Sequence, residues 1–225
     1  MPQRKDPDTS ERLDPVLAAA YKAEADKHKA EARYWTAEAE VAETFARKAL
    51  RSESLRSNPR YFFTQEVDEV SIRKCMKRLD EWDHDFPDCD VEITFTSPGG
   101  NCIDGFALWD YLMEYRNKGH CLMTHTLGMA ASMAGVLLQA GDRRYMGAES
   151  FLLIHNIATT GLPYSKIGEV EDELLFLKKL QDRFMNILAS RSTLSVDEIK
   201  ERADRRDWWL NSEEALALGF IDEVV

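Results

Sequence analysis

Two glycine-bearing segments of this sequence each follow an apolar, strand-like run and precede a helix-like run. They are Ser97-Pro98-Gly99-Gly100 and the segment from Gly128 to Met133. Amides in such turns converge on one point, and the positive end of the helix dipole adds to their field. On neighbouring parallel strands, one amide from Gly99-Gly100 and one from Ser132-Met133 would form an oxyanion hole from the backbone alone.

A serine in the second turn would act as a nucleophile beside those amides. Ser132 holds that position, and its attack on a carbonyl needs a base. His155 is the only one of the five histidines placed at the C-terminal end of an expected strand, where ligand sites of parallel sheets lie. Each residue also has an ordinary structural interpretation, a small residue in a close-packed helix for Ser132 and a structural histidine for His155.

The elements that position these residues follow from periodicity and turn signals. Expected strands cover residues 60–64, 91–96, 121–127, 144–146 and 151–154, with a terminal strand after Gly219. Expected helices cover residues 66–82 and 103–118, a segment ending near 140–142, residues 165–190, a helix capped by Ser195 with Glu198, and one capped by Ser212. His84 then falls in an acidic loop. This alternation predicts an α/β fold of repeated β/α units with a largely parallel, helix-covered sheet.

Residues 1–57 differ in composition from residues 58–225. They are rich in Ala, Glu, Lys and Arg, with no glycine and, beyond position 15, no proline. Such a segment is helical by propensity. Tyr21, His28 and Trp35 recur at seven-residue spacing and indicate a narrow seam. We expect a long, mostly solvated helical arm that pairs with a partner, ahead of one peptidase-sized domain; a floppy charged extension is the alternative.

Composition excludes several classes of function. The net charge of −11 argues against nucleic-acid binding, which needs a basic face. No apolar run reaches the roughly 18 residues of a membrane span, and no signal-peptide core follows the N-terminus. The four cysteines lack CxxC spacing and histidine partners, so we expect free thiols, no metal and no cofactor, in a reducing cytoplasm.

Four motifs in this order resemble those of ClpP-type peptidases, over roughly residues 60–225. They are the segments 97–100 and 128–134, Leu153-Ile154-His155, and Arg206-Asp207 ahead of Ser212-Glu213-Glu214-Ala215 and Gly219-Phe220-Ile221-Asp222. The resemblance implies a ClpP/crotonase-like fold and a serine endopeptidase. It also implies site roles: Ser132 as nucleophile, His155 as base, Asp207 as the acid that orients it, and the Gly100 and Met133 amides as oxyanion donors.

The family also implies a homo-oligomer of stacked rings, usually heptameric, that encloses its sites and cleaves unfolded polypeptides or short peptides. ATP would enter only through a separate AAA+ unfoldase. Four features depart from the family. Asn156-Ile157 stands where Gln-Pro is typical, residues 158–166 hold one glycine, Gly161, where the family is glycine-rich, Arg205 replaces an aspartate beside Arg206, and the arm is unlike the axial loop. The first and the last favour a phage-type capsid or scaffold protease slightly over a bacterial Clp subunit.

Three other interpretations stay open. A crotonase-fold enzyme acting on acyl-CoA shares the two-amide oxyanion hole but needs no triad. A signal-peptide-peptidase-like enzyme would use a Ser-Lys dyad. A noncatalytic subunit of a mixed Clp-like ring would carry Ser132 out of alignment.

Overall fold

The computed structural model describes residues 59–87, 89–159 and 166–225, together with residues 19, 22, 24, 26–29, 32–33, 35–40 and 42–43. The chain divides into two compact units, Met1–Ser54 and Leu55–Val225. In the first unit the described residues are helical and exposed. Tyr21 lies outside the described residues, so the predicted seam of the arm stays a prediction.

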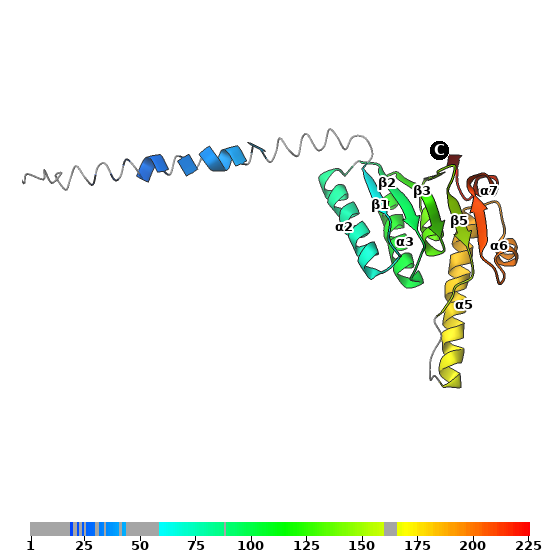
Figure 1. The fold of residues 1–225 in the computed structure, drawn as a ribbon. Helices are drawn as coiled ribbons and strands as arrows, with labels where there is room; N and C mark the ends of the chain where they lie inside the picture. The colour runs from blue at the N-terminus through cyan, green and yellow to red at the C-terminus, as the bar shows by residue number, and fades with distance from the viewer. Residues whose placement is uncertain are drawn as a thin grey trace, which may run out of the picture. The chain divides into compact units, whose positions relative to one another are not determined.

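The second unit is built on a seven-stranded sheet (Figure 1). Five strands pair in parallel in the order β1-β2-β3-β4-β7: β1 (Arg60–Phe63), β2 (Val91–Ser97), β3 (Leu122–Ala131), β4 (Arg143–Met146) and β7 (Glu223–Val224). Strand β5 (Phe151–Ile154) pairs in parallel with β3, and β6 (Trp208–Asn211) pairs antiparallel with β5. The predicted α/β fold with a largely parallel sheet is confirmed.

Strand β3 is the branch point of the sheet. Its first half, Met123–Thr126, pairs with β4, and its second half, Met129–Ala131, pairs with β5. The predicted strand stopped at Leu127 because the small residues that follow carry no strand-like alternation. Pairing with β5 extends β3 to Ala131, immediately before Ser132.

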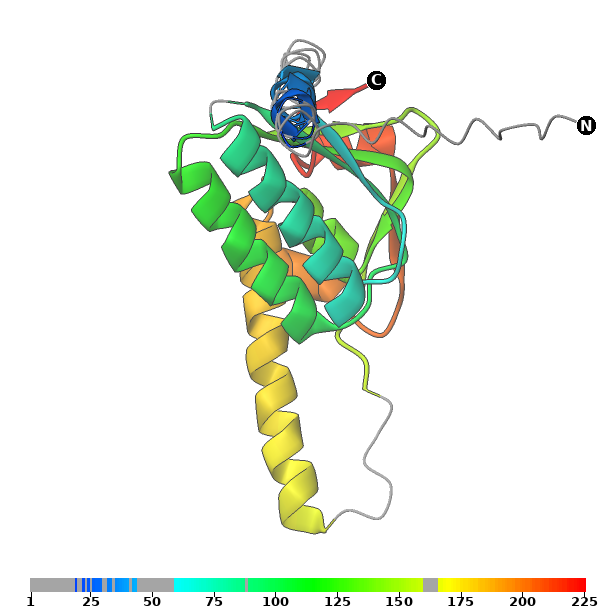
Figure 2. The same ribbon diagram turned by 90° about the vertical axis from the view of Figure 1, so that its left-hand side faces the viewer.

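Six helices are described in this unit: α2 (Glu69–Asp85), α3 (Cys102–Asn117), α4 (Met133–Leu138), α5 (Ile167–Ser190), α6 (Val196–Arg202) and α7 (Ser212–Ala217). Helices α2 and α3 lie side by side along one face of the sheet (Figures 1 and 2). Every residue of α4 is buried, which makes it the central helix of the core. None of the described helices is long and apolar enough to cross a membrane.

Helix α5 is anchored by its C-terminal half alone. Its buried residues are Leu180, Phe184, Met185 and Leu188. The N-terminal half projects from the body of this unit (Figure 2), and Ile167 at its start is 81% exposed.

Local capping explains where several helices begin. Ser195 caps α6 with Glu198, as predicted. For α7 the predicted cap is wrong: Asn211 accepts from the Glu214 N–H, while Ser212 is the first helical residue and donates to the Ala148 carbonyl. Sequence alone favoured the serine because Asn211 is the last residue of β6, a strand that was not predicted.

Helix α2 also lies three residues further along the chain than predicted. Asp68 caps it reciprocally with Ser71, so the helix starts at Glu69. It ends at Asp85, and His84 therefore lies in its last turn and not in a loop.

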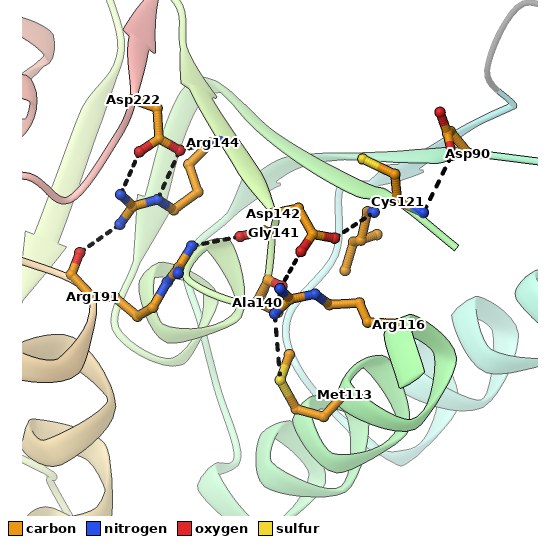
Figure 3. Close-up of polar contacts among 11 residues, drawn as sticks. Asp90, Met113, Arg116, Cys121, Ala140, Gly141, Asp142, Arg144, Arg191 and Asp222 are labelled. Carbon is orange, nitrogen blue, oxygen red and sulfur yellow. Dashed lines mark hydrogen bonds and ion pairs between the residues drawn. The ribbon is translucent and has the colours of Figure 1, made fainter. Parts of the chain in front are cut away.

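A partly buried polar network joins four parts of this unit (Figure 3). Arg144 on β4 binds the Asp222 carboxylate through Nε at 3.1 Å and Nη2 at 2.6 Å. Its Nη1 donates to the side chain of Gln139, the C-cap residue of α4, and to the Arg191 carbonyl. Arg191 in turn donates to the Gly141 carbonyl. Arg144 thereby ties the C-terminal segment to the core.

Candidate active site

Ser132 lies in the sharp turn between β3 and α4. Its φ of 54° and ψ of −124° are conformations that non-glycine residues rarely adopt, at a cost of about 1–3 kcal/mol. The Ser132 N–H donates to the Leu153 carbonyl at 2.9 Å, which fixes the turn against β5. Strain of this kind is concentrated at functional sites, and here it presents one serine at the end of a strand.

The two glycine-bearing turns are in contact. Gly99 has a φ of 88°, and a Cβ there would lie 2.5 Å from the Ala131 carbonyl oxygen and 2.7 Å from Cβ of Ser132. Only glycine fits so close to the neighbouring backbone. The turns meet because β2 and β3 are adjacent parallel strands that end at the same edge of the sheet.

Two backbone amides lie at this edge, those of Gly100 and Met133. Gly100 forms an isolated parallel bridge in which Val67 donates to the Gly99 carbonyl and accepts from Asn101, so the N–H of Gly100 itself points away from Val67. Met133 is the first residue of α4, so no helical carbonyl lies one turn earlier to accept from its N–H. Within the described ranges neither amide donates to a backbone carbonyl outside its own helix or strand. An oxyanion donor must have its N–H unoccupied in this way.

His155 and Asp207 lie at the adjoining ends of an antiparallel pair. Ile154 of β5 pairs with Trp208 of β6, so His155 and Asp207 are the next residues on the two strands. His155 Nδ1 lies 3.9 Å from Asp207 Oδ1, beyond the 2.7–3.2 Å of a hydrogen bond. The side chains are 28% and 63% exposed. In this structure Asp207 therefore lies next to the imidazole without a hydrogen bond to it.

The register of β3 and β5 brings Ser132 to the same edge as His155. Ala131 pairs with Leu153, so both chains leave the sheet within two residues of that pair. An open pocket adjoins the site, lined by His155, Asn156, Ala203, Arg205, Arg206 and Asp207. Arg205 has a φ of 55° and, with Ser132, is one of two non-glycine residues with positive φ in the described part of the chain.

One contact next to the site was missed from the sequence. Gln181 on α5 accepts from the Ile157 N–H at 2.6 Å and donates to Asn156 Oδ1 at 2.9 Å. The partners are 24 and 25 residues away along the chain, and glutamine on a helix carries no motif that would single it out.

The other titratable clusters bring no metal site. Among the described residues no group of three or more His, Cys, Asp or Glu side chains is placed to hold a metal ion. The four cysteines are free thiols. The chemistry that the site can support on its own residues is acyl transfer, with a serine hydroxyl, an imidazole and two backbone amides at one edge of the sheet.

This architecture, a branched parallel sheet with a strained serine turn before a buried helix, is that of the ClpP/crotonase class. The family model for Clp protease matches residues 46–225, and the chain belongs to that family, whose members are peptidases. One relative is the ATP-dependent Clp protease proteolytic subunit 2 of Thermobifida fusca (strain YX), 32% identical over 73% of this chain and 79% of its own. The subunit of the same name from Tropheryma whipplei (strain Twist) is 33% identical over 62% of this chain and 76% of its own.

Proposed function

We propose that this protein is a serine endopeptidase in which Ser132 is the nucleophile, His155 the base and Asp207 the acid. One observation carries the proposal: Ser132 lies in a strained turn packed on Gly99, at the edge of the sheet where His155 also emerges. The family membership supports the general class, a peptidase.

The geometry supports the following steps. His155 takes the proton of Ser132 as Oγ attacks the carbonyl carbon of the substrate. The amides of Gly100 and Met133 donate to the oxyanion, and the Asp207 charge, 3.9 Å from Nδ1, stabilises the imidazolium. The proton then passes to the leaving amine, and an acyl-enzyme remains on Ser132. Water, deprotonated by His155, releases the second product and restores the serine.

We further propose that the working form is a homo-oligomer that encloses its sites and acts on unfolded polypeptides. The projecting half of α5 exposes Ile167, Leu174 and Phe176, apolar surface that association would remove from water. The named relatives are proteolytic subunits of ATP-dependent proteases, which favours a separate AAA+ unfoldase as partner. A phage-type protease of capsid or scaffold proteins is the alternative, distinguished by whether cleavage of a folded substrate requires such an ATPase.

The first test is labelling with a fluorophosphonate probe, followed by mass spectrometry of the modified site. Labelling and the hydrolysis of short fluorogenic peptides are both measured for the parent protein, for Ser132→Ala and for the control Ser190→Ala. The control changes an exposed serine of α5. We expect label on Ser132 in the parent and the control, and neither label nor hydrolysis in Ser132→Ala. An assembled, folded parent without label would refute the proposal and indicate a noncatalytic subunit. Hydrolysis of acyl-CoA in place of peptides would indicate the crotonase-type alternative.

A further inference from the structure

The segment that follows His155 leaves the sheet at once. Ile154 is the last residue of β5 with a cross-strand partner. Residues 155–159 form no helix or strand. The backbone on the C-terminal side of His155 therefore needs contacts from outside the sheet if the imidazole is to keep its place at this edge.

Gln181 supplies that hold with both ends of its side-chain amide. Its Oε1 accepts from the Ile157 N–H at 2.6 Å, and its Nε2 donates to Asn156 Oδ1 at 2.9 Å. Within the described residues, these are the hydrogen bonds that the segment 156–158 makes. Two bonds of opposite polarity fix which end of the amide faces which partner.

The helix that carries Gln181 is rigidly held at this point. Leu180 is 8% exposed, and Phe184 and Met185, one turn further on, are 1% and 0% exposed. Gln181 therefore lies where α5 first becomes anchored in the core. Its hydrogen bonds fix the two residues after His155 relative to that core.

The separation of His155 from Asp207 makes this hold matter. At 3.9 Å the carboxylate does not hydrogen-bond to Nδ1, so it does not by itself orient the ring. Ile157 also provides a backbone N–H that a proline at the same place would lack.

We propose that Gln181 is a positioning residue for His155: it holds residues 156 and 157 so that the imidazole stays within reach of Ser132. The inference rests on the proposed function of the site. It assigns no chemistry to Gln181, which acts only through its contacts with Asn156 and Ile157.

The test compares the full-length parent with Gln181→Met, Gln181→Glu and the control Asn186→Met. Methionine keeps the volume of glutamine but makes neither hydrogen bond. Glutamate keeps the acceptor for Ile157, and the exposed Asn156 amide can turn so that its NH₂ donates to the carboxylate. Asn186 is exposed on the same helix, so its change loses no contact of this kind.

Hydrogen exchange of the Ile157 amide measures the contact itself, and steady-state hydrolysis of a short peptide measures its effect. For Gln181→Met we expect faster exchange at Ile157 and a fall in kcat of about ten- to hundredfold, because small misplacements of catalytic groups have effects of that size. KM should stay within about twofold, since uniform substrate binding is untouched. Gln181→Glu should recover most of the kcat, and Asn186→Met should match the parent.

The outcomes separate the two ideas. Unprotected Ile157 in the parent overturns the contact, and faster exchange in Gln181→Met with an unchanged kcat overturns the positioning role. An equal loss of kcat in Gln181→Met and Gln181→Glu also contradicts it, because the conservative change should rescue. A folded parent that neither hydrolyses peptides nor is labelled at Ser132 overturns the proposed function, and the positioning role with it. Protection of the Ile157 amide in that protein would show that the Gln181 contact exists without serving catalysis.

Discussion

Replacing Asp222 by asparagine should reveal how strongly the network of Figure 3 holds the C-terminal segment to the core. Three donors of Arg144 point at the Asp222 carboxylate: the backbone N–H at 2.8 Å and Nε at 3.1 Å toward Oδ2, and Nη2 at 2.6 Å toward Oδ1. In asparagine one of the two oxygens becomes an NH₂ group, which must face at least one donor. The guanidinium, only 8% exposed, then loses its counter-charge.

The expected loss of unfolding free energy at neutral pH is about 2 kcal/mol. Removing one partner of a fully buried ion pair costs about 3–5 kcal/mol. The Asp222 side chain is 44% exposed, so solvent screens part of the interaction. The expected loss therefore falls below that range, to about 2 kcal/mol, which is close to the value of a hydrogen bond to a charged group. In a domain of this size that loss corresponds to a fall in Tm of about 4–8 °C.

The loss should depend on pH in a defined direction. Burial alone would raise the pKa of Asp222, but the hydrogen bonds and charge of Arg144 outweigh burial, and its pKa is lowered. A carboxyl with a lowered folded-state pKa contributes its stability above the unfolded-state pKa of about 3.9, and loses it as the pH falls through the lower folded-state value. The gap between parent and Asp222→Asn should therefore be full at pH 6–7 and close below about pH 4.

Urea unfolding followed by circular dichroism at several pH values measures this gap. The matched control is Asp182→Asn, because Asp182 pairs with Lys200 at 2.9 Å but is 60% exposed, and its loss should be below about 0.5 kcal/mol. Equal stabilities of Asp222→Asn and this control at neutral pH would refute the reasoning. A gap that persists unchanged at pH 3 would show that packing, and not charge, is responsible.

Three further predictions concern the site and the core. Gly99→Ala should lower kcat by about 10²–10³-fold, the range for a lost oxyanion donor. The reason is that its Cβ would lie 2.5 Å from the Ala131 carbonyl oxygen and displace the turn. A kcat within threefold of the parent, with an unchanged melting curve, would contradict this. Asp207→Asn should lower kcat of peptide hydrolysis by about 10²–10⁴-fold with little change in KM, since the charge beside His155 is lost; an unaltered kcat would remove Asp207 from the triad. Burial raises the pKa of the Cys75 thiol, so Ellman's reagent should react with it only as fast as the domain unfolds, and rapid reaction in native buffer would count against the buried core of α2.

Much of the fold could be predicted because it depends on local patterns. Alternating strand and helix periods were enough for a parallel α/β sheet, and right-handed parallel connections place successive strand ends at one edge. That logic predicts that the turns at Gly99 and Ser132 meet, and their contact is observed. The Ser195–Glu198 cap was predicted for the same reason, since both partners lie within one turn.

The roles of Ser132, His155 and Asp207 in catalysis stay predictions, but their placement shows where sequence reasoning stops. Asp207 came from family resemblance alone, because a loop acid before two tryptophans carries no local signal. Tertiary structure makes Trp208–Asn211 an antiparallel strand on β5, and that pairing carries Asp207 to His155. The same strand explains why Asn211, and not Ser212, caps α7.

Most strands, helices and turns could be predicted from local sequence, because backbone sterics and hydrophobic periodicity act over a few neighbouring residues. Strand β6 could not, because it forms by pairing with β5 more than 50 residues earlier in the chain. Long-range packing sets the branching of β3, the 3.9 Å separation of His155 from Asp207, and the contact of Gln181 with the segment after His155. Those features join residues tens of positions apart. They depend on how whole elements pack, which no local pattern encodes.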